Sequence, residues 1–151
     1  MPSIRDLKDF LKAGHLPTLL TAFLYFDVCF SVWVVNGAMA PFISQEFNLT
    51  PAQKGFMVSV PVISGALMRF PLGILAQYIG RKRAAMLEMS IICACLVWGY
   101  FFTHSLGAVL AMGIALGVAG ASFGVALSLG SGWYPPKYKG LAMGIAGAGN
   151  S

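Results

Sequence analysis

The sequence predicts an all-α membrane protein with four complete transmembrane helices and the start of a fifth. Apolar residues make up 58% of the 151 residues and charged residues only 10%, whereas a soluble domain carries about 25% charged residues. The charges are also unevenly spread. Several stretches between them are long enough to cross the roughly 30 Å hydrocarbon layer of a bilayer. We therefore expect the chain to lie within the lipid bilayer.

The first 16 residues are predicted to form a charged, cytoplasmic lead-in. Within it, Ile4, Leu7, Phe10 and Leu11 would share one face of a short helix at the membrane surface. The first span should follow at about residues 17–42, because the next long apolar stretch begins at Pro17.

Turn and cap residues divide the rest of the chain. Thr50 followed by Pro51 predicts an N-cap with proline at the first helical position. The further spans are expected at about residues 52–78, 84–102 and 106–133, and a glycine-rich helix begins near residue 140. A span needs about 20 residues, so this last helix is incomplete at residue 151. We expect residues 17–151 to be a partial N-terminal transmembrane domain of a longer protein.

The basic residues predict the orientation of the chain. The loops on one side hold all the basic residues except Lys54 and Arg69: Arg5, Lys8, Lys12, Arg81, Lys82, Arg83, Lys137 and Lys139. Cytoplasmic loops carry the excess of lysine and arginine in membrane proteins. We therefore predict a multi-pass protein of the inner (plasma) membrane with a cytoplasmic N-terminus.

Several function classes find no support in the sequence. The three cysteines, Cys29, Cys93 and Cys95, lie within apolar stretches and match no zinc-binding spacing. His15 and His104 have no candidate partners for a metal site or a catalytic pair. The net charge of +5 is explained by the loop charges, and no nucleic-acid-binding motif accompanies it. We expect no cofactor, no metal, no nucleic-acid partner and no enzyme activity.

Arg69 is the most informative residue because it is predicted deep within the second span. It lies roughly 14 Å of helix from the cytoplasmic end, and burying an arginine there costs about 2.5–3.5 kcal/mol or more. Its planar guanidinium suits an anion with coplanar oxygens. Asp27 lies at a similar depth in the first span, so it could instead pair with Arg69, or carry a proton for coupling.

Two further features of the sequence are expected to have structural roles. Glu88 is expected to reach the membrane interface near the start of the third span, where a helix N-terminus favours negative charge. Glycines at 4-3-4 spacing should form close-packing faces on the last two helices. These are Gly113, Gly117, Gly120 and Gly124, and then Gly140, Gly144 and Gly147.

The segment Gly73-Ile74-Leu75-Ala76-Gln77-Tyr78-Ile79-Gly80-Arg81-Lys82 resembles the loop motif between the second and third helices of the major facilitator superfamily. That motif normally has an acidic residue where Gln77 stands, so the resemblance implies no charge relay here. Gly73, Gly80, Arg81 and Lys82 keep the glycines and the basic turn. The implied fold is part of a six-helix N-terminal half.

Finer motifs resemble the nitrate/nitrite porters of the NarK type. These motifs are the segment from Gly117 to Phe123, the turn Trp133-Tyr134-Pro135-Pro136, the glycine-rich stretch from Gly140 to Asn150, and Arg69 before Phe70-Pro71. By this resemblance Arg69 would contact nitrate or nitrite and Phe123 would flank its flat face. Gly147 and Asn150 would line the site.

The resemblance implies transport by alternating access, completed by a missing C-terminal half or a second chain. Two other functions stay open: a truncated membrane remnant that only binds a partner, and a facilitator for another small anion.

Overall fold

The computed structural model describes residues 4–148, with side chains from Lys8 onward. The described part of the chain is entirely helical, without a strand. Its helices are α1 (Ile4–Ala13), α2 (Leu16–Ala38), α3 (Ala40–Glu46), α4 (Pro51–Ile79), α5 (Arg81–Phe102), α6 (Leu106–Ser131) and α7 (Pro136–Gly147). Four helical segments are long and apolar enough to cross a membrane: Leu16–Glu46, Pro51–Ile79, Arg81–Phe102 and Leu106–Ser131. The prediction of four spans and the start of a fifth helix is confirmed.

The ends of the long helices are fixed by local side-chain bonds. The Thr50 hydroxyl accepts from the backbone N–H of Gln53 at 3.3 Å, and the Gln53 side chain accepts from the backbone N–H of Thr50 at 2.9 Å. This reciprocal capping box satisfies two donors that a helix start leaves free, and it confirms the predicted N-cap.

The first predicted span differs from expectation, because it divides at Met39 into α2 and α3. Pro41 lacks the N–H that would continue the helical bonding.

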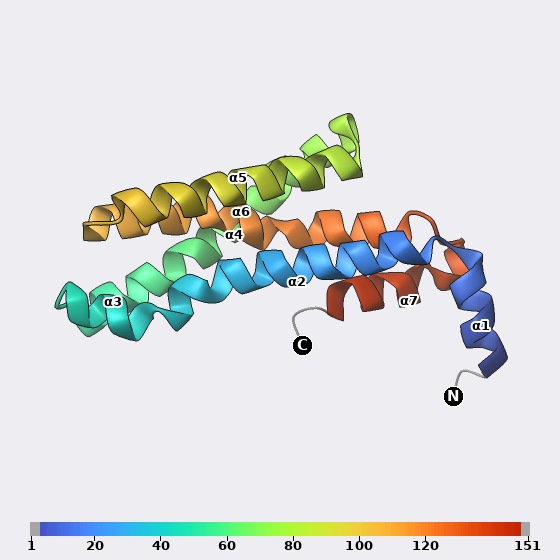
Figure 1. Cartoon of the computed structure of the whole chain (residues 1–151), viewed down its shortest axis with the longest axis horizontal. Coiled ribbons are helices and arrows are strands. Elements are labelled where there is room, and N and C mark those ends of the chain that lie inside the picture. The colour runs from blue at the N-terminus through green and yellow to red at the C-terminus, as the bar shows by residue number, and fades with distance from the viewer. Residues whose placement is uncertain (1–3, 149–151) are drawn as a thin grey trace.

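Helix α6 is the central element of the bundle. It contacts α2, α4, α5 and α7, and Figure 1 shows it between α5 and α2, with α7 alongside one end. Its closest approach is to α4: a Cβ added at Gly117 would overlap Ser64, and one added at Gly65 would lie 3.2 Å from the Gly117 carbonyl oxygen. The Ser64 hydroxyl also donates to the Ile114 carbonyl oxygen at 2.6 Å. Small residues therefore let the two backbones meet.

The predicted glycine faces pack only in part. Gly113, Gly117 and Gly120 are in close contact with other helices, whereas an added Cβ at Gly124, Gly140 or Gly144 would meet no atom within 4 Å among the described residues. Helix α7 instead buries Ala142 and Ala146 against its neighbours. Within the described residues the alanine face of α7 points inward, and the packing role expected of Gly140 and Gly144 stays a prediction.

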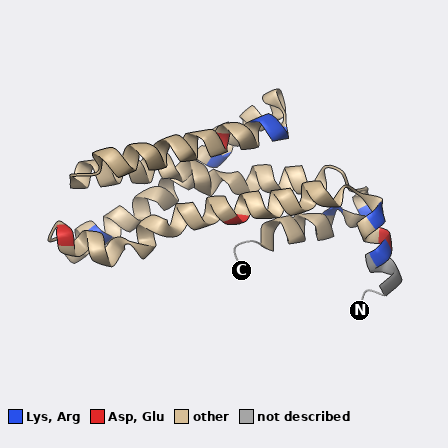
Figure 2. Ribbon diagram, viewed as in Figure 1, with Lys and Arg blue, Asp and Glu red and all other residues tan. Residues whose placement is uncertain are grey.

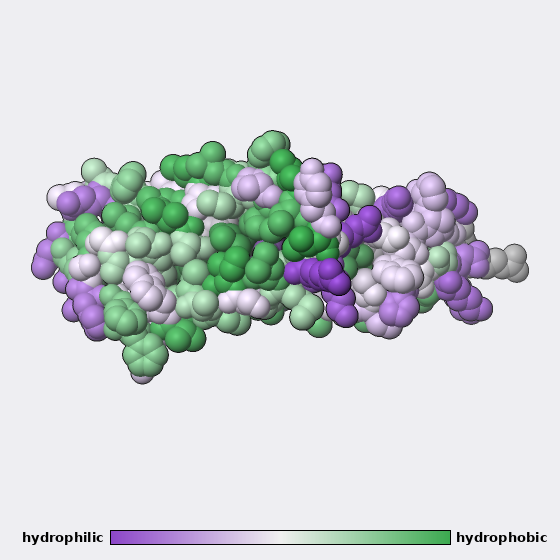
Figure 3. All heavy atoms as spheres, turned by 90° about the horizontal axis from the view of Figure 1, so that it is seen from above, coloured by the Kyte–Doolittle hydropathy of each residue, from purple (hydrophilic) through white to green (hydrophobic). Residues whose placement is uncertain are grey.

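The charged segments gather at the ends of the bundle. Figure 2 shows the charged residues mainly near the helix ends, and Figure 3 shows a broad hydrophobic surface between hydrophilic ends. The lead-in lies beside the turn between α6 and α7, since the Phe10 ring stacks on Tyr134 with centroids 4.7 Å apart. Phe10 is thus buried against protein, not on the membrane-facing side where the sequence pattern placed it.

Glu88 is also placed differently from expectation. Its side chain is fully buried, and the Tyr25 hydroxyl of α2 donates a hydrogen bond to its carboxyl group. The prediction that Glu88 reaches the membrane interface is wrong. It faces inward from α5, toward α2, and the helix packing around it blocks the path to the surface.

Candidate functional site

Arg69 reaches across from α4 to α6. Its Nε donates to the Gly120 carbonyl oxygen at 3.3 Å. Among the described residues, neither terminal nitrogen of the guanidinium has a hydrogen-bond partner. One edge of the guanidinium is therefore held by α6, and the two terminal NH₂ groups are left to bind a ligand.

The arginine lines a small cavity between α2, α4 and α6. The cavity has a volume of about 150 Å³ and is lined by Phe26, Phe30, Trp33, Arg69, Ala119, Gly120 and Phe123. Pockets for drug-sized ligands have roughly 300–1,000 Å³, and one water occupies about 30 Å³ of the liquid. The space therefore suits an ion of a few atoms, with or without a water.

Aromatic rings form most of the cavity wall. Phe26 lies 5.2 Å from Phe123 and Phe30 lies 5.8 Å from Trp33, measured between ring centroids. The Trp33 ring is fixed because its Nε1 donates to the Pro61 carbonyl oxygen at 3.0 Å. Apolar walls lower the local dielectric and so strengthen the attraction of a guanidinium for an anion. Ring edges carry partial positive charge and can also face an anion.

The sequence-predicted site residues are partly brought together. Arg69 and Phe123 line the same cavity. Gly147 is not one of the lining residues but contacts Phe123, since an added Cβ there would be 3.4 Å from the ring. Asn150 lies outside the described residues. No ion pair joins Asp27 to Arg69 in the described part of the chain, so pairing does not neutralise the arginine in this conformation.

Three cavity residues were missed by the sequence analysis: Phe26, Phe30 and Trp33. Their spacing of four and then three residues places them on one face of α2, and that spacing was the signal available. Aromatic residues at helical spacing usually mark packing or lipid contact, so the pattern does not reveal a ligand site until α4 and α6 are placed beside it.

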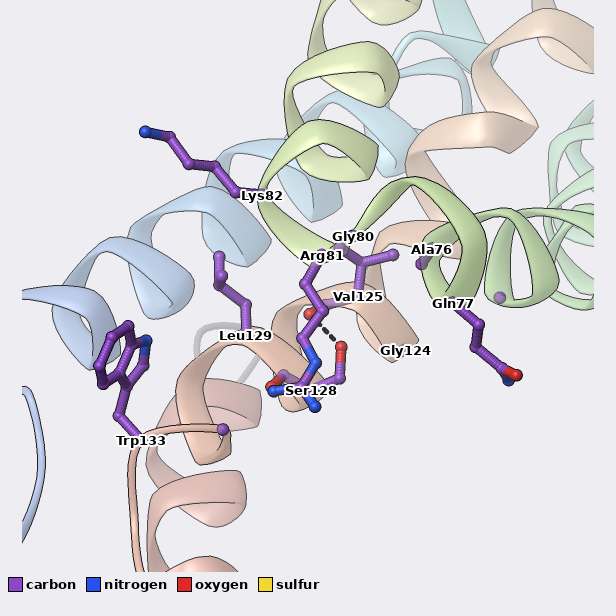
Figure 4. A pocket seen from close by; sticks show the side chains of 12 residues that line it. Ala76, Gln77, Gly80, Arg81, Lys82, Gly124, Val125, Ser128, Leu129 and Trp133 are labelled. Carbon is purple, nitrogen blue, oxygen red and sulfur yellow. Dashed lines mark hydrogen bonds between the residues drawn. The ribbon is translucent and has the colours of Figure 1, made fainter.

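A second, larger cavity lies at the turn between α4 and α5. It has a volume of about 880 Å³ and includes all five loop-motif residues: Gly73, Gln77, Gly80, Arg81 and Lys82. Arg81 points toward the end of α6, where its Nη1 donates to the Ser128 carbonyl oxygen at 3.0 Å; Gln77 and Lys82 point away (Figure 4). A cation at a helix C-terminus is favourable, so Arg81 joins this turn to α6.

Comparison with known proteins identifies the family. The family model described as "Major Facilitator Superfamily" matches residues 21–151. The chain belongs to the major facilitator superfamily.

This major facilitator chain is also similar to curated transporters. It is 34% identical over 142 residues to the "Probable nitrate transporter NarT" of Staphylococcus aureus strains JH9, Newman and COL. The matched region covers 92% of this chain and 35% of each relative. The chain thus spans about a third of the length of these relatives.

Proposed function

We propose that this chain forms part of a transporter for nitrate or nitrite and that the cavity at Arg69 binds the anion. The observation that carries the proposal is Arg69, which lines a small cavity with aromatic walls and whose terminal nitrogens have no hydrogen-bond partner among the described residues. A guanidinium binds planar oxyanions through two parallel hydrogen bonds. The similarity to proteins named as nitrate transporters supports this substrate class.

Transport would proceed by alternating access around the cavity. Major facilitator transporters bind substrate near the bilayer midplane between two repeated halves that rock against each other. The cavity is formed by α2, α4 and α6, so a further half, from the same protein or from a second chain, would close it. Phe123 would press on the flat face of the anion, with Gly147 behind it and Asn150 nearby.

The membrane placement is proposed from charge and packing. The lead-in packs against the turn before α7 through Phe10 and Tyr134, and Arg81 bonds to the end of α6. These contacts bring the three basic segments of the chain to one end of the bundle. Such an end faces the cytoplasm, so we place the protein in the plasma membrane with its N-terminus inside.

Uptake by proteoliposomes tests the proposal. The whole native protein is reconstituted, and labelled nitrate uptake is measured against unlabelled nitrate, nitrite, sulfate or a small carboxylate. We expect nitrate and nitrite to compete and the others to fail. No uptake of labelled nitrate, together with uptake of labelled sulfate or a labelled small carboxylate, would favour a facilitator for another anion. An immunoblot against the lead-in showing only a 16.0 kDa product, without uptake, would favour the non-transporting alternative.

A further inference from the structure

Glu88 is a buried carboxyl group that the proposed anion site does not use. It is 0% exposed and lies in the second turn of α5, which begins at Arg81. The Tyr25 hydroxyl of α2 donates to its Oε2. Its Oε1 is buried and has no partner among the described residues. The carboxyl group is therefore held at one oxygen and free at the other.

The groups around this carboxyl are neutral or apolar. Helix α2 presents Tyr25 and Cys29, and Cys93 lies further along α5. Helix α6 presents Ser122, whose hydroxyl donates to the Ala119 carbonyl oxygen at 2.7 Å. Helix α4 contributes Ala76 and Ile79 to the same core. No described lysine, arginine or histidine forms an ion pair with Glu88.

This environment favours a protonated carboxyl group. A buried carboxylate is stable only with a cation or with several donors, and a single tyrosine hydroxyl supplies neither. The favourable effect of a helix N-terminus falls off within its first turn, and Glu88 lies beyond it. The free Oε1 is the atom that would carry the proton. An ionisable side chain kept inside a membrane protein in this way is a candidate functional site.

The carboxyl group and the anion cavity share the same two helices. On α2, Tyr25 and Cys29 face the Glu88 side, while the residues directly after them, Phe26 and Phe30, line the cavity. On α6, Ser122 is buried directly before the cavity residue Phe123. A movement of α2 against α6 that opens the cavity would therefore also disturb the packing that covers Glu88.

We propose that Glu88 is the proton-binding site that couples proton movement to anion transport. The inference depends on the proposed function. While α2 covers Glu88, the carboxyl group holds its proton; when α2 moves away, the O–H bond breaks, the proton passes to water and a hydrated carboxylate remains. Tyr25 is a positioning residue, because its hydroxyl orients the carboxyl group.

Two measurements on the native protein in proteoliposomes test this inference. The first is infrared difference spectroscopy, in which a protonated carboxyl group gives a C=O stretching band at neutral pH. We expect the band in the native protein, its loss in Glu88→Gln, and its retention at a shifted frequency in Tyr25→Phe.

The second measurement compares nitrate uptake driven by an imposed pH gradient with nitrate counterflow, which moves no net protons. We expect Glu88→Gln to lose the stimulation by the gradient and to keep counterflow.

The matched control is Asp27→Asn, which alters the other carboxyl group of α2 and α5. It should keep both the infrared band and the stimulation by the gradient. Loss of either signal in Asp27→Asn but not in Glu88→Gln would overturn the assignment to Glu88. Full gradient stimulation in Glu88→Gln would overturn the coupling role. Native protein that shows the band but transports no nitrate would overturn the proposed function, and the coupling with it, while the protonation of Glu88 would stand.

Discussion

Arg69 of α4 donates through Nε to the backbone carbonyl of Gly120 on α6, at 3.3 Å. This bond holds the guanidinium against α6, beside the cavity that Arg69 lines together with Phe26 and Phe123. It also ties the charged group of one helix to the backbone of another, so the shape of the anion site depends on how closely α4 and α6 approach.

Replacing Arg69 by alanine should abolish nitrate uptake. Among the described residues that line the cavity, Arg69 is the one cation. A hydrogen bond to a charged group is worth about 1.5–3 kcal/mol, or roughly 10- to 100-fold in affinity for each bond. Arg69→Lys keeps the charge but not the planar pair of donors, so we expect partial loss. Uptake of labelled nitrate by the reconstituted whole protein measures the effect of both substitutions. The control is Lys82→Ala, which alters an exposed basic residue that points away from α6 (Figure 4). Normal uptake in Arg69→Ala would refute the proposed anion site.

Replacing Phe123 by alanine should weaken anion binding and relax selectivity. The ring lies 5.2 Å from Phe26, and an aromatic contact contributes about 0.5–1.5 kcal/mol beyond the area it buries, roughly 2- to 12-fold in affinity. The enlarged cavity should also admit bulkier anions. Competition assays with anions of increasing size check this. Phe101→Ala removes an exposed ring outside the cavity and should leave the competition series unchanged.

Replacing Gly120 by alanine should destabilise the bundle. An added Cβ would lie 2.6 Å from Trp33 Nε1, so either the Trp33 ring or α2 itself would have to shift. Overpacking of this kind costs about 1–3 kcal/mol. Gly124→Ala is the matched control on the same helix. Its Cβ meets nothing within 4 Å, so we expect stability to stay the same or rise by about 0.5–1 kcal/mol. Thermal unfolding in detergent compares the two, and equal midpoints would contradict the predicted contact.

The contact of the lead-in with Tyr134 should weaken at high pH. Burial raises the pKa of the Tyr134 phenol above its ordinary value of 10.0, so the folded state holds that proton more tightly than the unfolded state. The packing is therefore at full strength below about pH 10 and is lost as the pH rises through the raised pKa. A spin label on Leu11→Cys, with the native cysteines replaced, would become mobile over that range.

Tyr134→Phe separates the phenol from the ring in the same assay. The Tyr134 hydroxyl is buried without a partner among the described residues, so its removal should cost no stability at neutral pH. The variant should keep the label immobile at high pH, because the buried phenol that stacks on Phe10 can no longer ionise. A label that is equally mobile at high pH in both proteins would show that another group controls the contact.

Much of the fold could be predicted because the relevant signals are local. The apolar stretches predict the spans, and Thr50 with Pro51 predicts where α4 begins. Arg69 could be singled out because a charge at that depth is costly wherever its helix points. Asn150 and the side of the membrane on which the loops lie stay predictions.

The residues around Arg69 could not be predicted in the same way. Phe26, Phe30 and Trp33 are ordinary apolar side chains until α2 is turned toward α4 and α6. Glu88 has an ordinary position near a helix start, and only the packing of α5 against α2 buries it beside Tyr25. Which glycines pack also depended on the rotation of the helices. A Cβ at Gly120 would meet Trp33, whereas one at Gly124 would meet no atom of the described residues within 4 Å.

By itself, then, the sequence determined that the chain is a bundle of membrane-spanning helices with one basic end and one deep arginine. Hydropathy, charge and helix caps act over a few residues, so they can be read along the chain. The tertiary structure decided which side chains surround that arginine and which carboxyl group is buried. Both depend on the rotation and crossing of the helices, which are set where Gly65 and Gly117 let α4 and α6 meet.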